Sequence, residues 1–125
     1  MARPIHLACL CAAWCRLCDE YAPVLATVAE AFAAEGVRLQ VHWIDIEDEA
    51  DLVGDFDVET FPTIVIARGP QVRFSGPVTP QPGTLSRLLR ATVLEASADA
   101  ATPVFPAEVQ AFAIRLDQRS TAARA

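Results

Sequence analysis

The feature that most constrains this chain is the pentapeptide Trp14-Cys15-Arg16-Leu17-Cys18. It joins an apolar run, Ile5 to Ala13, to a stretch with helical spacing, Asp19 to Ala34. Two cysteines three residues apart at a helix start lie on one turn, so their sulfur atoms can bridge with little backbone movement. The unpaired N–H groups of the helix start favour a thiolate at the first cysteine, and Arg16 adds positive charge beside it. The pattern predicts a strand, a turn and a helix that hold an attacking and a resolving thiol.

Composition narrows the remaining choices. A chain of 125 residues, 53% hydrophobic and 21% charged, fits one compact domain. Its net charge of -6 argues against nucleic acid or an anionic membrane as partner. The longest apolar run is far below the roughly 20 residues that span a bilayer, and no small-residue cleavage site marks it as a signal peptide. We therefore expect a cytoplasmic protein, where four cysteines indicate redox or metal chemistry.

Hydrophobic periodicity predicts a mixed sheet covered by helices, in the order β-α-β-α-β-β-α. The expected strands are 4–11, 37–46, 63–67 and 71–75, and the expected helices are 15–34, 48–55 and 79–96. The first strand should be buried on both faces. The second should bury Val41, Trp43, Ile44 and Ile46. Thr84 is a candidate cap for the third helix.

The last part of the chain has a different composition. Residues 97–106 are mostly small residues and proline, and they precede an amphipathic segment, 106–119, with Val109, Phe112 and Leu116 on one face. We expect one domain over residues 1–96, followed by a linker and helical extension over 97–125. This last helix should pack on the domain.

Three features accompany the dithiol. Trp14 precedes it, Pro23 lies eight residues beyond Cys15, and Thr60-Phe61-Pro62-Thr63 precedes the predicted hairpin. Together with the order of strands and helices, they make residues 5–96 resemble the thioredoxin family. The resemblance implies a thioredoxin-like α/β fold, with a mixed four-stranded sheet flanked by helices. The family's N-terminal strand and helix are missing, and the C-terminal helix is extra.

The resemblance also implies a mechanism. Cys15 would attack a disulfide, and the more buried Cys18 would break the resulting mixed disulfide. It implies a thiol–disulfide oxidoreductase of cell redox homeostasis that acts on protein disulfides without a cofactor. The resemblance also implies a thioredoxin-reductase-type protein as the electron donor. We expect the protein to be a monomer.

Substrate contacts follow from the same resemblance. Trp14 would shield the dithiol and offer an apolar contact, with Arg16 beside it. Pro62 resembles the family's cis-proline, and the backbone of Phe61 would pair with an extended substrate segment. Gly76 resembles a glycine of the family's apolar docking surface.

The departures from the family are as informative. Cys9 stands where the family has a buried carboxylate, and Trp43 stands where the family has a lysine. We expect Trp43 to lie in the core. Without that base, Cys18 should lose its proton less readily and turnover should be slower. Arg16-Leu17 replaces the Gly-Pro of thioredoxin itself, and Arg16 should make the dithiol more oxidising.

Cys9 and Cys11 are predicted on one face of the first strand. The simplest interpretation is two small buried hydrophobic residues. A second makes them auxiliary thiols, with Cys9 exchanging with Cys18. A third is a metal or iron–sulfur site of all four cysteines, whose spacing is not that of usual zinc ribbons.

The remaining candidates are weaker. His6 and His42 lie on predicted strands and are best interpreted as hydrogen-bonded structural residues, so no metal site is predicted from them. The acidic segment 45–59 is most simply a solvated face, although it can also steer basic partners. A second function class therefore stays open beside the oxidoreductase. It is a thioredoxin-fold binding or chaperone-like module that senses redox state with little turnover.

Overall fold

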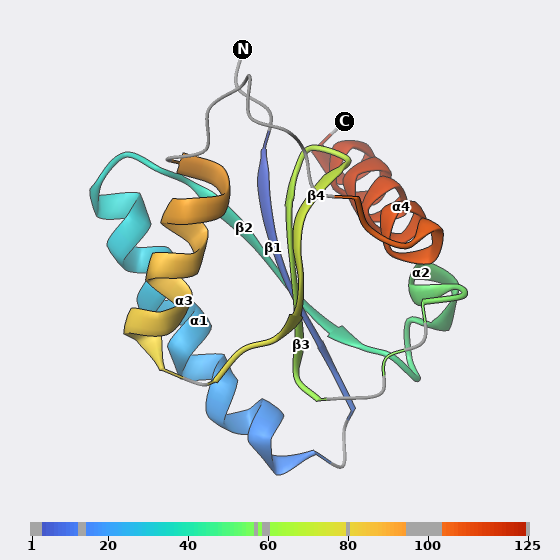
Figure 1. Cartoon of the computed structure of the whole chain (residues 1–125), viewed down its shortest axis with the longest axis horizontal. Helices are drawn as coiled ribbons and strands as arrows, with labels where there is room; N and C mark the ends of the chain where they lie inside the picture. The colour runs from blue at the N-terminus through green and yellow to red at the C-terminus, as the bar shows by residue number, and fades with distance from the viewer. Residues whose placement is uncertain are drawn as a thin grey trace.

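A four-stranded mixed sheet, in the order β2-β1-β3-β4, forms the centre of the computed structural model (Figure 1). The structure describes residues 4–12, 15–56, 58, 61–79, 81–94 and 104–124. The elements are β1 (Ile5–Cys11), α1 (Arg16–Ala34), β2 (Leu39–Asp45), α2 (Ala50–Val53), β3 (Thr63–Arg68), β4 (Gln71–Pro77), α3 (Pro82–Leu89), the π-helical turn η1 (Arg90–Leu94) and α4 (Ala107–Arg124).

The central strand is β1. It pairs in parallel with β2 and antiparallel with β3, and β3 continues into the β3–β4 hairpin. Gly69, in the turn of that hairpin, has a φ of 57°, which a residue without Cβ adopts at little cost. All seven residues of β1 are buried. The predicted mixed sheet, its hairpin and its first strand buried on both faces are confirmed.

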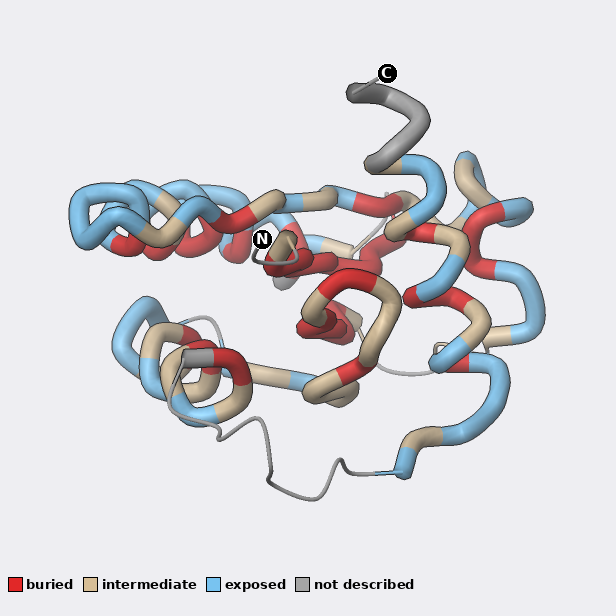
Figure 2. Tube along the Cα trace, turned by 90° about the horizontal axis from the view of Figure 1, so that it is seen from above, coloured by how far each residue is buried: buried red, intermediate tan, exposed pale blue. Residues whose placement is uncertain are grey.

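Helices cover both faces of the sheet, as Figure 1 shows: α1 and α3 lie on one side, and α2 and α4 on the other. Alternation along β1 divides its side chains between two cores. Leu7, Cys9 and Cys11 join the core under α1 and α3, whereas Ala8 and Leu10 join the core under α4. Figure 2 shows the buried segments gathered between the helices, whose outer sides are exposed.

The strand β2 differs from expectation. Ile44 is fully buried and Ile46 is half-buried, but Val41 is 39% and Trp43 is 42% exposed. The predicted burial of Val41 and Trp43 is wrong because β2 is an edge strand, with a neighbour on one side only. Trp43 is therefore not a core residue. It faces solvent beside Cys9, its partner on β1.

Two helices also differ from their predicted bounds. α3 begins at Pro82 with Gln81 as its N-cap, so the prediction that Thr84 caps it is wrong. A proline suits a first helical position, whose N–H has no partner within the helix. α2 has only four residues because the Asp45 carboxylate accepts the N–H groups of Glu47 and Asp48 and holds them in a turn.

The last helix packs on the sheet, as predicted. Val109, Phe112 and Leu116 of α4 are buried against β1, β3 and β4 residues. Its Arg115 donates hydrogen bonds to the carbonyl oxygens of Leu52 (2.8 Å) and Val53 (2.9 Å), which are at the end of α2. α4 thus supplies one layer of the fold. None of the helices in the described ranges has both the length and the apolar character that crossing a bilayer requires.

Candidate functional site

Three segments meet at one end of the sheet. Because β1 and β3 are antiparallel, the end of β1 lies beside the start of β3, where Leu10 pairs with Thr63. Thr63 pairs in turn with Pro77 at the end of β4. The turn from β1 into α1, the Phe61–Pro62 segment and the end of β4 are therefore neighbours, at the lower end of the sheet in Figure 1.

The two cysteines of the motif lie at the start of α1. Cys15 is the N-cap residue, with extended backbone (φ −90°, ψ 111°), and its N–H donates to the carbonyl oxygen of Ala12 at 3.0 Å. Its side chain is half-buried, whereas Cys18, one turn further, is 1% exposed. Arg16, the first residue of the helix, is exposed. The arrangement gives one reachable thiol and one covered thiol.

The other predicted substrate contacts surround this turn. The Phe61–Pro62 peptide bond is cis, Pro62 is buried, and Phe61 packs against the core that contains Cys18. Gly76 of β4 is half-buried, and a Cβ there would lie 3.4 Å from the ring of Phe74. Trp14 lies outside the described residues.

Beneath the motif lie two more thiols. Cys9 and Cys11 are buried in the same core as Cys18, and their Sγ atoms are 3.3 Å apart. The predicted common face of these two cysteines is confirmed. All four cysteines are free thiols. The described residues contain no group of three or more His, Cys, Asp or Glu side chains that could hold a metal ion.

The surroundings of Cys11 and Cys18 disfavour the thiolate form of these two side chains. The hydrogen bond from Cys9, followed by burial, raises the pKa of Cys11 far above its usual range. Burial, followed by a hydrogen bond with Cys11, strongly raises the pKa of Cys18. A hydrogen bond between Cys15 and Cys18 acts in the same direction on Cys18. The causes lie in burial and in the neighbouring thiols, and the expected effect of replacing the family's carboxylate by Cys9 stays a prediction.

Sequence patterns assigned Tyr21 only to the apolar stripe of α1, but it has a polar role as well. Its side chain is fully buried, and its hydroxyl donates to the carbonyl oxygens of Val78 (2.7 Å) and Thr79 (2.9 Å). Burial, and then the charge of Cys9, raises the pKa of this phenol. Tyr21 therefore ties α1 to the segment that follows Gly76. A tyrosine in a buried stripe was the available signal, because its O–H needs a partner there.

A polar network occupies the other face of the sheet. His6 is fully buried, and its ring nitrogens lie 3.0 Å from Nε2 of His42 and 2.9 Å from Oδ1 of Asp117 on α4. The interpretation of both histidines as hydrogen-bonded structural residues is confirmed, and Asp117 is a partner that the sequence patterns missed. Burial, and then the charges of His6 and Arg119, lower the pKa of His42 to about 4.

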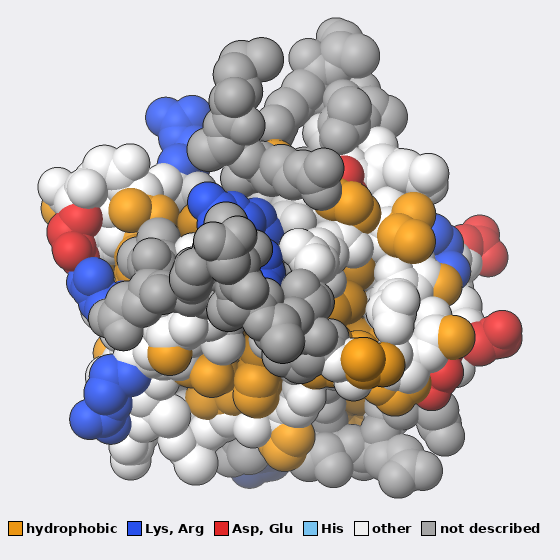
Figure 3. All heavy atoms as spheres, turned by 45° about the horizontal axis from the view of Figure 1, so that its top comes forward, with side chains coloured by type: hydrophobic (Ala, Val, Ile, Leu, Met, Phe, Trp, Pro, Cys, Tyr) orange, Lys and Arg blue, Asp and Glu red, His pale blue; other side chains and the backbone are white. Residues whose placement is uncertain are grey.

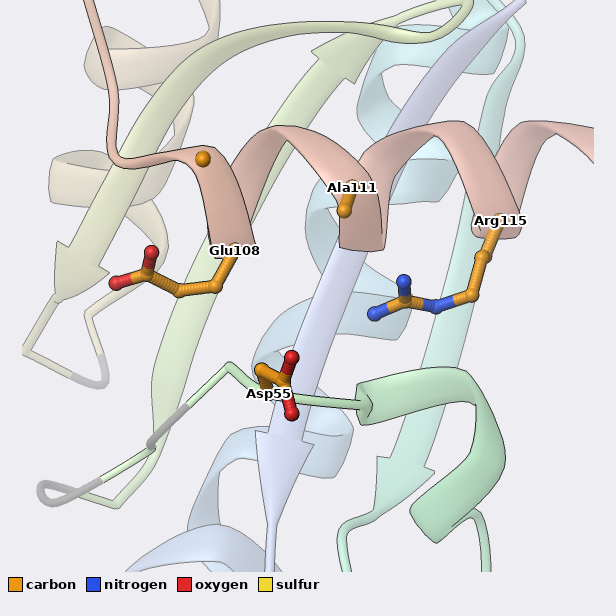
Figure 4. Close-up of a pocket in the computed structure, with 5 residues that line it drawn as sticks. Asp55, Glu108, Ala111 and Arg115 are labelled. Carbon is orange, nitrogen blue, oxygen red and sulfur yellow. The ribbon is translucent and has the colours of Figure 1, made fainter.

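A pocket of about 340 Å³ also lies on this face, away from the thiols. Figure 4 shows the Arg115 side chain of α4 pointing toward Asp55, which lies beyond the end of α2, whereas the Glu108 side chain points away from Asp55. Exposed acidic residues surround this side of the molecule, where Figure 3 shows Asp and Glu side chains at the edge near α2 and α4. Within the acidic segment, Glu47, Asp48, Asp51 and Asp55 are exposed, as the simpler interpretation predicted, and Asp57 and Glu59 lie outside the described residues.

Known proteins were compared with the chain and its fold. A family model described as Thioredoxin matches residues 2–86. The germline-specific thioredoxin Deadhead of Drosophila melanogaster has a similar structure, with a TM-score of 0.60 and 20% identity over 73% of this chain and 83% of that chain. Chloroplastic thioredoxin z gives a TM-score of 0.60 and 22% identity over 72% of this chain and 79% of that chain. Thioredoxin-2 of the malaria parasite gives a TM-score of 0.62 and 18% identity over 73% of this chain and 85% of that chain. No curated protein sequence matches the chain significantly.

Proposed function

Because this chain belongs to the thioredoxin family, we propose that it is a thiol–disulfide oxidoreductase that exchanges protein disulfides through Cys15 and Cys18. The observation that carries the proposal is the pairing of a reachable thiol at a helix start with a buried thiol one turn further. An attacking thiolate must reach its substrate, whereas a resolving thiol acts only after the substrate is bound.

The proposed reaction has two exchange steps. The Cys15 thiolate attacks one sulfur of a substrate disulfide, the substrate S–S bond breaks, and the departing substrate sulfur takes a proton. Cys18 then loses its proton and attacks Cys15 in the mixed disulfide. The Cys15–Cys18 disulfide forms and the second substrate thiol leaves. The substrate is reduced by two electrons and the protein is oxidised by two.

A surface around Cys15 would bind the substrate. Phe61 lies against the core that holds the dithiol, and the half-buried Gly76 is on the neighbouring strand. The Phe61 backbone, beside the buried Pro62, would pair with an extended substrate segment. Trp14 and Arg16 would complete this surface on the side of α1.

The remaining features of the proposal follow the family. The partners are proteins that carry a disulfide or dithiol, and a thioredoxin-reductase-type protein would return the dithiol to its reduced form. We propose that the protein acts as a monomer in the cytoplasm and needs no cofactor.

One observation favours a second candidate. The strongly raised pKa of Cys18 slows resolution, so the protein would keep a mixed disulfide for longer than an efficient reductase does. A thioredoxin-fold module that binds partners and senses redox state, with little turnover, would tolerate this property.

Two matched variants distinguish these candidates. In a dithiothreitol-driven assay of insulin reduction, Cys15→Ser should fall to the rate measured without protein. Cys18→Ser should instead accumulate a covalent complex with the substrate, visible on a non-reducing gel. Full activity of Cys15→Ser would contradict the proposed enzyme. Unchanged partner binding in Cys15→Ser, together with negligible turnover of the wild type, would favour the module.

A further inference from the structure

The proposed exchange leaves two nucleophilic groups unused. Cys9 and Cys11 are 0% and 2% exposed, and both belong to the core beneath α1. Their Sγ atoms are 3.3 Å apart, which is about 1 Å longer than a disulfide bond. Two thiols in contact at this distance are a dithiol by geometry, not merely two small apolar side chains.

These thiols are in contact with the motif. Cys11 is hydrogen-bonded to Cys9, and both belong to the same buried core as Cys18. Cys15 packs against this core, and Cys18 lies one turn further along α1. The four thiols therefore form one series within this core, from the half-buried Cys15 to the covered Cys18, Cys11 and Cys9.

Only one end of this series is open to a substrate. Cys15 is half-buried, whereas the other three thiols are covered. A disulfide reagent in solution therefore meets Cys15 first. Any oxidation of Cys9 and Cys11 in the folded protein has to pass through Cys18, because exchange requires direct attack of one sulfur on another.

We propose that Cys9 and Cys11 form a second, internal dithiol, which takes up the disulfide of Cys15 and Cys18 by exchange through Cys11. The inference rests on the proposed function, because a substrate disulfide must first oxidise Cys15 and Cys18. It makes the protein a carrier of up to two disulfides, and so of four electrons.

The transfer is balanced at each step. Cys11 loses a proton and attacks Sγ of Cys18, the Cys15–Cys18 bond breaks, and Cys15 leaves as a thiolate. Cys9 then loses a proton and attacks Cys11, the Cys11–Cys18 bond breaks, and Cys18 takes up a proton. One disulfide has moved inward and no net electron has been gained or lost. A second substrate disulfide can then oxidise Cys15 and Cys18 again.

The environment of the inner thiols sets the speed of this transfer. Its attacking group is a thiolate, and the hydrogen bond from Cys9 together with burial keeps Cys11 protonated at neutral pH. Inward transfer should therefore be slower than the first exchange at Cys15. Its rate should rise about tenfold for each pH unit, as the thiolate fraction does below the pKa of a thiol.

The experiment counts thiols during oxidation. Fully reduced protein is mixed with excess oxidised glutathione at pH 7.5 and 8.5, quenched with acid, unfolded, alkylated and weighed by mass spectrometry. Two thiols should disappear in a fast phase and two more in a slow phase that is about tenfold faster at the higher pH. Trypsin cleaves after Arg16 and so separates Cys18 from the other three cysteines, which allows each disulfide to be assigned.

Two variants test the route. Cys9→Ala should lose two thiols only, because Cys11 then has no partner for the last step. Cys18→Ala should keep Cys9 and Cys11 reduced. The inference is overturned if the wild type keeps Cys9 and Cys11 alkylatable after the fast phase, or if Cys18→Ala loses them as fast as the wild type does. A missing fast phase would instead overturn the proposed function itself. Should a variant fail to fold, the wild-type time course decides alone.

Discussion

The two faces of β1 carry different chemistry. Toward α1, alternate residues place Cys9 and Cys11 in the same core as Cys18, and Cys9 and Cys11 are hydrogen-bonded to each other. Toward α4, His6 sits between His42 and Asp117 in a network that includes a carboxylate. One strand thus separates a thiol face, where the pKa values of Cys11 and Cys18 are raised, from a polar face, where the pKa of His42 is lowered. The thiols and the last helix therefore use opposite faces of the same strand.

The largest expected effect is on the thiol face. The strongly raised pKa of Cys18 means that its thiolate fraction, and hence resolution of the mixed disulfide, should rise about tenfold per pH unit. A single-turnover measurement should show about a hundredfold increase between pH 7 and pH 9. A flat profile over this range would show that another group removes the proton from Cys18.

The second prediction concerns the α4 face. Phe112 is fully buried, so Phe112→Ala should lower the free energy of unfolding by about 3–5 kcal/mol. Ile114 on the same helix is 45% exposed, and Ile114→Ala should cost less than about 1 kcal/mol. Urea denaturation measures both. Similar values for the two variants would mean that α4 is not a layer of the core.

The third prediction is the acid sensitivity of the same face. Because the pKa of His42 is lowered to about 4 from 6.5, the folded state prefers the neutral ring. This contribution is complete above about pH 6.5 and is lost as the pH falls toward 4, by about 2–3 kcal/mol. His42→Gln should lose this part of the pH dependence. The free energy of unfolding of wild type and variant is measured by denaturation at pH 7.5, 6 and 5. The difference between the two proteins separates the contribution of His42 from that of the carboxylates, and a difference that does not change with pH would refute the prediction.

The smallest effect is expected at Tyr21. Tyr21→Phe removes the hydroxyl that donates to the Val78 and Thr79 carbonyl oxygens and should cost about 1–2 kcal/mol of unfolding free energy. The exposed hydrogen bond of Thr84 offers a control, and Thr84→Val should change stability by about 0.5 kcal/mol or less. Equal effects of the two variants would show that Tyr21 does not tie α1 to the segment after β4.

The sequence predicts the parts of the fold that depend on local patterns. A continuous apolar run predicts the buried β1, helical spacing predicts α1, and alternation puts Cys9 and Cys11 on one face. Val41 and Trp43 are the failures, because their exposure depends on β2 being an edge strand, and strand order is not a local property.

In the candidate site, too, local features are predicted from the sequence and features that depend on packing are not. The motif and its position at a helix start are visible in the sequence. The placement of Cys11 and Cys18 in one core depends on how α1 packs over β1. The role of Asp117 likewise depends on α4 docking more than 100 residues after His6, a distance over which no sequence pattern acts.

The most direct test of the account is a redox titration in glutathione buffers, with acid quenching, thiol alkylation and peptide mapping of all four cysteines. In samples quenched early at each potential, we expect the first disulfide, formed in a two-electron step, to join Cys15 to Cys18 while Cys9 and Cys11 are still alkylated. A protein that keeps Cys15 and Cys18 reduced throughout the titration would contradict it.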